Sequence, residues 1–167
     1  MSETLRLTAT LSALNLRLEP LDGARPVDPP NDLFRLGELL LDAYHAASGD
    51  PKSVPADEQV AGADALEAVD GLLSGTYGTF DAEASELVER EGRVVTATLV
   101  TTPEGGPLVA IAMTHPTWQR RGLAGASVAR AMARLAARGE TSVDALVTDD
   151  NERALALFRS LGFAERP

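Results

Sequence analysis

One stretch constrains the fold of this chain more than any other. Residues Leu108 to Thr114 are apolar at nearly every position, which predicts a strand covered on both faces of a sheet. Pro116 ends that strand, and the loop Gln119–Ala124 leads into a helix whose apolar positions follow the 3.6-residue period as far as Gly139. A buried strand, a small-residue loop and an amphipathic helix in this order predict a mixed α/β fold.

The remaining periodicities supply the other elements of such a fold. Alternation of apolar and polar residues predicts one bent strand or two short ones over residues 5–9 and 14–18. The later strands follow one another in a meander that is continued by a helix and a further strand. Further predicted elements are a helix capped by Asn31 or Asp32, a loop at 48–55, a helix at about 57–73, strands at 85–89, 94–102 and 143–148, a helix capped by Asp150 or Asn151, and a terminal strand from Phe163.

The loop after the buried strand is suited to an anion. Backbone N–H groups at the start of a helix are unpaired, and the helix dipole favours negative charge there. Gly122 and Ala124 are small where a ligand would approach the backbone, and Arg120 and Arg121 add positive charge. A tight turn without a ligand would leave the same pattern. The P-loop and dinucleotide-binding patterns are absent from this loop.

Two motifs make the pattern specific. Gln119-Arg-Arg-Gly122-Leu-Ala124 resembles the Q/R-x-x-G-x-G/A signature of the GNAT acetyltransferase superfamily, with His115-Pro116 similar to its strand exit. The segment Asn151 to Phe163 resembles that family's second motif, N-x-x-A-x-x-L-Y-x-x-x-G-F. The resemblance implies one GNAT acyl-CoA N-acyltransferase domain over residues 1–167. Its α/β fold would have a central mixed, mostly antiparallel sheet flanked by helices, with a shortened C-terminal hairpin.

The resemblance also implies an activity, the transfer of an acetyl group from acetyl-CoA to a primary amine by direct attack. Backbone N–H groups of the loop would hold the CoA pyrophosphate, and the strand end Ala112–Thr114 would pair with the pantetheine. The N–H of Met113 or Thr114 would polarise the thioester carbonyl. The expected CoA-binding residues are Ala112, Met113, Thr114, Gln119, Arg120, Arg121, Gly122, Leu123, Ala124, Asn151, Ala154 and Phe158. Asn151 is equally explained as a helix N-cap, and Ala154 and Phe158 as core residues.

The chain departs from the family at the usual acid and base. Phe158 stands where relatives commonly have a Tyr, and the strand Leu108–Thr114 lacks the Glu that many relatives use as a base. Glu86, with Met113 and Thr114, is our catalytic candidate. Tyr44, Tyr77, Glu89 and His115 are further candidates, and each of these side chains is also explained by surface or packing roles. A catalytically weak acyl-CoA-binding or regulatory module, or a scaffold that binds no CoA, is therefore an alternative.

The charge distribution bears on the partners. The formal net charge is −10, and residues 1–80 carry 13 acidic and 5 basic side chains, which disfavours nucleic-acid binding. In the resembling family the first two helices and the loop between them wall the acceptor pocket. Four carboxylates there predict a cationic amine acceptor, although they also serve solubility: Asp50, Asp57, Glu58 and Asp81.

Several further expectations come from what the sequence lacks. The absence of cysteine excludes disulfides, thiolate metal sites and an acyl-cysteine mechanism, and no metal site is predicted. We expect a cytoplasmic protein without a membrane partner, since neither a signal peptide nor a membrane-spanning run is visible. The family's last strand would be missing, supplied by a neighbouring subunit, or replaced by the N-terminal alternating segment. An exposed sheet edge would favour a homodimer.

Overall fold

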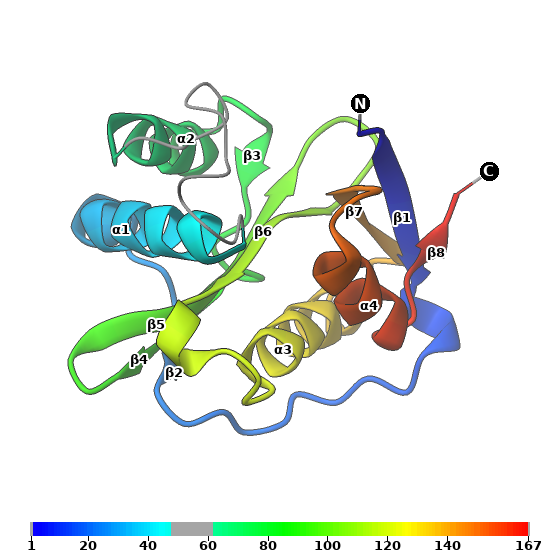
Figure 1. Cartoon of the computed structure of the whole chain (residues 1–167). Helices are drawn as coiled ribbons and strands as arrows, with labels where there is room; N and C mark the ends of the chain where they lie inside the picture. The colour runs from blue at the N-terminus through cyan, green and yellow to red at the C-terminus, as the bar shows by residue number, and fades with distance from the viewer. Residues whose placement is uncertain (1, 48–61, 167) are drawn as a thin grey trace.

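A single twisted sheet forms the centre of the protein. The computed structural model describes residues 2–47 and 62–166 and is shown in Figure 1. In chain order the elements are β1 (Thr4–Thr10), η1 (Leu11–Ala13), β2 (Ala24–Arg25), α1 (Pro29–Ala47), α2 (Gly62–Ser74), β3 (Thr79–Phe80), β4 (Glu86–Arg90), β5 (Arg93–Thr102), β6 (Leu108–Thr114), η3 (Pro116–Trp118), α3 (Leu123–Ala137), β7 (Ser142–Thr148), α4 (Glu152–Ser160) and β8 (Ala164–Glu165). The predicted mixed α/β fold with an antiparallel meander is confirmed.

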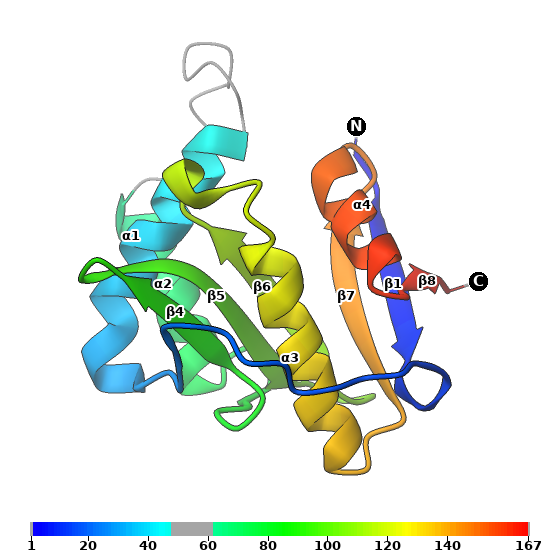
Figure 2. The ribbon, with the colours of Figure 1, turned by 90° about the horizontal axis from the view of Figure 1, so that it is seen from below.

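Helices cover both faces of this sheet. The strands lie in the order β2-β4-β5-β6-β7-β1-β8, with β3 added beside β5. Among the strands described, β6 and β7 form the parallel pair and the other pairs are antiparallel. Helices α1 and α2 lie on one face and α3 and α4 on the other (Figures 1 and 2), each over its own apolar cluster. No helix in the described ranges is long and apolar enough to span a bilayer.

The sheet divides between β6 and β7. These strands pair at Leu108 with Asp144 and at Val109 with Ala145, and their recorded pairing ends there although both strands continue. A register shift against β5 at the same level leaves Ala110 as the extra residue of a β-bulge. The ribbons of β6 and β7 then diverge on either side of α3 (Figure 2). We call this opening the V.

The N-terminal strand completes the arm of the sheet beyond the V. β1 pairs along its whole length with β7 and at two residues with β8, and Leu7 and Ala9 are fully buried. The N-terminal segment therefore supplies the strand between β7 and β8, as the third of the three alternatives for the family's last strand expects. Both termini lie at this edge of the molecule (Figure 1).

The prediction of a second short strand over residues 14–18 is wrong. After η1 the chain runs without a strand partner across α3 to the other arm of the sheet, where it forms β2 (Figure 2). The apolar side chains of Leu14 and Leu16 pack against the core under α3, and Leu18 is exposed. The alternation of apolar and polar residues therefore reflects an extended connection with one apolar side, which links β1 to β2 across α3.

The ends of α1 and α2 also differ from expectation. α1 begins at Pro29, so Asn31 and Asp32 lie in its first turn instead of capping it. Proline is well placed at a helix start, because its missing N–H would have no partner there. The described part of α2 begins at Gly62, and the predicted loop 48–55 and residues 57–61 of the predicted second helix lie outside the described residues.

Candidate functional site

The loop between β6 and α3 presents a row of backbone donors. Arg120 and Gly122 have positive φ angles of 63° and 77°, which turn the chain sharply before α3 begins at Leu123. Gly122 is the N-cap of α3 and no side chain caps the helix. Among the described residues, the N–H groups of residues 120–125 have no hydrogen-bond partner. These donors and the α3 dipole form a site suited to phosphate oxygens.

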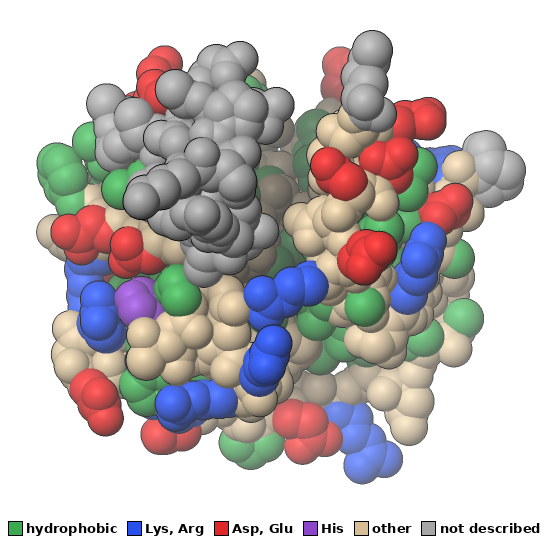
Figure 3. Space-filling view, viewed as in Figure 1, with side chains coloured by type: hydrophobic (Ala, Val, Ile, Leu, Met, Phe, Trp, Pro, Cys, Tyr) green, Lys and Arg blue, Asp and Glu red, His purple; other side chains and the backbone are tan. Residues whose placement is uncertain are grey.

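Side chains fix the shape of this loop. Trp118 packs against the apolar cluster of Val88, Val95 and Leu123. The guanidinium carbon of Arg121 lies 4.5 Å from the Trp118 ring centroid, and Arg121 also donates to the Thr117 carbonyl at 3.4 Å. Lys and Arg side chains gather near the middle of the face that carries η3 and the start of α3 (Figure 3).

Gln119 joins the two sides of the V at its mouth. Its Nε2 donates to the Thr114 carbonyl at the end of β6, at 3.4 Å, and its Oε1 accepts from Arg153 of α4 at 2.9 Å. The first residue of the predicted phosphate loop therefore contacts both the end of β6 and the first turn of α4.

The strand register shows which backbone groups face the V. The His115 N–H donates to the Val95 carbonyl at 2.7 Å, and alternate residues of an antiparallel strand direct their backbone groups to the same neighbour. Met113 therefore directs its N–H and carbonyl toward β5, where the Thr96 hydroxyl also donates to that carbonyl. Ala112 and Thr114 direct theirs toward the β7 side, where the recorded pairing has ended. The N–H groups of Ala112 and Thr114 therefore face the V.

A comparison of the sequence with models of known protein families finds a match over the part of the chain that forms the V and the loop. Residues 86–167, which include β4 to β8, match the family model described as FR47-like protein. This part of the chain, from β4 to β8, belongs to the GNAT superfamily. No curated protein matches the chain significantly.

Solved structures share the fold at low identity. A GCN5-related N-acetyltransferase from Sphaerobacter thermophilus is 19% identical, with a TM-score of 0.67 over 99% of this chain and 49% of that one. PaiA N-acetyltransferase from Thermoplasma acidophilum, in complex with coenzyme A, is 9% identical, with a TM-score of 0.62 over 82% of this chain and 86% of that one. Diaminobutyrate acetyltransferase EctA from Paenibacillus lautus, in complex with L-2,4-diaminobutyric acid and coenzyme A, is 17% identical, with a TM-score of 0.55 over 82% of this chain and 72% of that one. The chain spans about half the length of the first two structures that it matches.

Residues of the second GNAT motif have structural roles that the sequence leaves open. Asn151 is the N-cap of α4, and its side chain accepts from the Ala154 N–H at 3.1 Å. Ala154 packs against the core. Phe158 is 6% exposed and lies edge-to-face against Phe163, with ring centroids 5.0 Å apart. These contacts account for the three residues without a ligand, and the Phe158 ring carries no proton to donate.

Glu86 lies on the α3 face of the sheet, in an ion-pair cluster. Its side chain is 2% exposed and contacts Arg130 and Arg134 of α3, each at 2.6 Å. Burial raises the pKa of Glu86, but hydrogen bonds from Arg130 and Arg134 outweigh this and hold it below the ordinary value. A carboxylate with two arginine partners and a lowered pKa is a poor proton acceptor. The geometry therefore favours a structural role over the catalytic one expected from the sequence.

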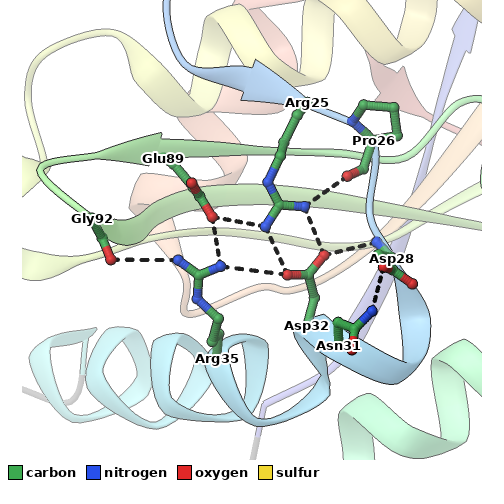
Figure 4. A network of polar contacts seen from close by, with 8 residues as sticks. All are labelled: Arg25, Pro26, Asp28, Asn31, Asp32, Arg35, Glu89 and Gly92. Atoms are coloured by element: carbon green, nitrogen blue, oxygen red, sulfur yellow. Dashed lines mark hydrogen bonds and ion pairs between the residues drawn. The ribbon is translucent and has the colours of Figure 1, made fainter.

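Glu89 is similarly engaged on the opposite face. It contacts Arg25 and Arg35 at 2.8 and 2.5 Å, and these arginines also contact Asp32, which is 1% exposed (Figure 4). Hydrogen bonds from Arg25 and Arg35 lower the pKa of Glu89. The cluster fastens α1 to β2 and β4 and so positions the helix beside the V.

The three other acid–base candidates are a histidine with structural contacts, a tyrosine remote from the phosphate loop, and a tyrosine whose side chain is not described. The Nδ1 of His115 accepts from the Thr117 N–H at 3.2 Å, and its Nε2 lies 3.6 Å from Asp42 of α1. Both ring nitrogens therefore face groups that hold η3 against α1. Tyr77 is half-exposed beside the β5–β6 turn, at the closed end of the V. The side chain of Tyr44 lies outside the described residues.

Asp81 does not contribute free negative charge to an acceptor pocket. Its N–H donates to the Val100 carbonyl, near the end of β5 that is remote from the phosphate loop, and its carboxylate contacts Arg138. Burial raises the pKa of Asp81, but hydrogen bonds from Arg138 and from the Ala84 N–H hold it below the ordinary value. The three other acidic positions expected in that pocket lie outside the described residues: Asp50, Asp57 and Glu58.

Proposed function

We propose that this GNAT domain is an N-acetyltransferase that moves the acetyl group of acetyl-CoA to a primary amine. One observation carries the proposal: the N–H row at residues 120–125, which has no partner among the described residues, follows the strand edge at Ala112 and Thr114 after the short turn η3. The V is lined by peptide groups and has a phosphate site at its mouth. This arrangement matches a ligand that carries a pyrophosphate and, attached to it, an arm that contains amides.

The residues present fit such a ligand. The donors of residues 120–125 would hold the pyrophosphate, and open space lies above Gly122, where an added Cβ would meet no atom within 4 Å. The pantetheine amides would pair with β6 in the V. Of the two predicted carbonyl donors the register favours Thr114 over Met113 and adds Ala112, because these two N–H groups face the V.

The chemistry then needs little beyond positioning. The neutral amine attacks the thioester carbonyl carbon, the C–S bond breaks, and the thiolate leaves while the amine nitrogen loses a proton. Alignment of two reactants can contribute about 7–11 kcal/mol, and one oxyanion donor about 3–4 kcal/mol. Phe158 supplies no proton to the thiolate, so water or the acceptor itself would supply it.

The packing of Phe158 also favours one alternative function. A site that binds acetyl-CoA but lacks both the usual acid and an unpaired carboxylate base on β6 would transfer slowly. The alternative is a catalytically weak acyl-CoA-binding or regulatory module.

For the acceptor we propose a cationic amine. With Asp81 paired to Arg138, the proposal rests on the overall acidic charge of residues 1–80 and on the acidic residues between α1 and α2. If neutral or anionic amines alone were acetylated in a panel, the acceptor proposal would be wrong while the transferase proposal would stand.

Release of free thiol from acetyl-CoA in the presence of an amine panel tests the function. The chain contains no cysteine, so every thiol detected comes from CoA. We expect release that saturates with at least one amine and exceeds the amine-free rate. Saturable acetyl-CoA binding without amine-dependent release would instead support the weak module, and absence of binding would support a scaffold.

A further inference from the structure

The arginines of the phosphate loop have no described carboxylate partner, whereas most other described arginines form an ion pair. Although acidic side chains outnumber basic ones by 25 to 15, six arginines in the described ranges have no described carboxylate within 4.0 Å. Two of them, Arg120 and Arg121, lie in the loop, and a third, Arg153, contacts its first residue. The remaining three are Arg17, Arg93 and Arg166.

One of these loop arginines is held in place by an aromatic ring. Arg121 lies over Trp118 at 4.5 Å and is tied to the Thr117 carbonyl. The guanidinium of Arg90 lies 6.0 Å from the same ring centroid, but its Nε donates to the Asp22 carbonyl at 3.0 Å and lies 3.9 Å from the Asp22 carboxylate. Trp118 is itself fixed by the cluster of Val88, Val95 and Leu123. Stacking on a fixed ring reduces the freedom that a guanidinium loses when it binds an anion.

The loop therefore offers two distinct anion-binding surfaces. The backbone donors of residues 120–125 match the pyrophosphate, and they require no arginine to do so. Arg121 lies within this loop and its stacked guanidinium is an additional source of positive charge. CoA carries a third phosphate, the monoester on its ribose 3′ oxygen, with a charge of about −1.5 to −2 at pH 7.

We propose that Arg121, positioned by Trp118, binds the 3′-phosphate and makes the site selective for CoA over its 3′-dephospho form. The proposal rests on the proposed function, because it takes CoA as the ligand. Arg121 would contact the phosphate, and Trp118 would act as a positioning residue that holds the guanidinium in place.

Calorimetric titration of the full chain with acetyl-CoA and with acetyl-3′-dephospho-CoA tests this selectivity. We expect the wild-type chain to prefer acetyl-CoA by about tenfold or more, as for a charge-assisted contact. Arg121→Gln should reduce the preference to about threefold or less, mainly by weakening binding of acetyl-CoA. Arg17→Gln changes the net charge equally at an exposed position on the connection across α3, and it should leave the preference unchanged.

Substitutions of Trp118 separate positioning from packing. Trp118→Leu keeps an apolar side chain in the cluster but removes the aromatic face, and it should reduce the preference as Arg121→Gln does. Trp118→Phe should keep most of it. Because Trp118 is the single tryptophan of the chain, its fluorescence should respond more strongly to acetyl-CoA than to the dephospho form.

Three outcomes would overturn the inference. Equal wild-type affinity for the two ligands would mean that the 3′-phosphate is not bound. An equal loss of affinity for both ligands in Arg121→Gln would place Arg121 on the pyrophosphate instead. Binding of neither ligand would overturn the proposed function together with this inference, and that result is distinguishable from equal binding of both.

Discussion

Replacing Gly122 with alanine is expected to weaken acetyl-CoA binding by about tenfold or more, which corresponds to about 1.4 kcal/mol. A Cβ at this position would meet no protein atom within 4 Å, so it would intrude only on the space in which the phosphates are proposed to lie. The positive φ of 77° should also cost about 1–2 kcal/mol of folding stability in any L-residue. Calorimetry for binding and chemical denaturation for stability would measure the two effects separately.

The other end of the same helix provides a matched control. Gly139 has a φ of 94°, and its Cβ would likewise meet no atom within 4 Å, but it follows the C-terminus of α3, away from the loop. Gly139→Ala should lose similar stability and keep its affinity for acetyl-CoA. If both variants bind as the wild type does, or if both lose affinity equally, the phosphate site is not at Gly122.

Replacing Glu86 with glutamine is expected to cost about 3–5 kcal/mol of unfolding free energy, the usual range for removing one partner of a buried ion pair. Glu86 faces two arginines from α3 in a nearly water-free position, and its loss would leave both without their carboxylate. Denaturant unfolding of the variant would measure the loss. Glu83→Gln is the control, because Glu83 is 73% exposed and lies 3.8 Å from Arg138, so its loss should cost less than about 1 kcal/mol.

The pH dependence of stability should follow from the same contact. The pKa of Glu86 is lowered in the folded protein from an ordinary value of 4.5, so its contribution is present above about pH 4.5 and is lost as the pH falls through the folded pKa. The wild type should therefore lose stability on acidification, and Glu86→Gln should lose less over that range. A variant as stable as the wild type at pH 7, or with an identical acid slope, would contradict this role for Glu86.

Much of the fold was predictable because its signals are local. The apolar run Leu108–Thr114 and the loop Gln119–Ala124 give the central strand, turn and helix, and the Asn151 cap gives the start of α4. The strands β2 and β3 have two residues each, which is too short for an alternating pattern to predict them. Their existence depends on strands β4 and β5, which come much later in the chain.

The candidate site was predictable to the extent that it consists of backbone. The loop donors follow from the motif, but the choice of Ala112 and Thr114 over Met113 depends on the register with β5, which a strand sequence does not contain. Trp118, Arg90 and Arg153 were missed as site residues. A single tryptophan beside the motif is a usable signal for Trp118, whereas Arg90 and Arg153 reach the loop only through folding.

Glu86 and Asp81 illustrate the limit for charged side chains. Both are acidic residues near a predicted strand, and the sequence alone leaves catalysis, substrate binding, packing and solubility open for them. Their partners Arg130 on α3 and Arg138 at its C-cap lie 44 and 57 residues away, and the spacing of Arg130, Arg134 and Arg138 becomes meaningful only when α3 packs across β4. Long-range packing therefore decides whether such a carboxylate is available for chemistry.

Titration of the wild-type chain with acetyl-CoA, followed by calorimetry, tests the central claim most directly. The V and its phosphate loop predict saturable binding of one acetyl-CoA per chain. At 100 times the dissociation constant the ligand should add about 2.7 kcal/mol to the unfolding free energy. No saturable heat, together with no stabilisation by acetyl-CoA, would contradict the account.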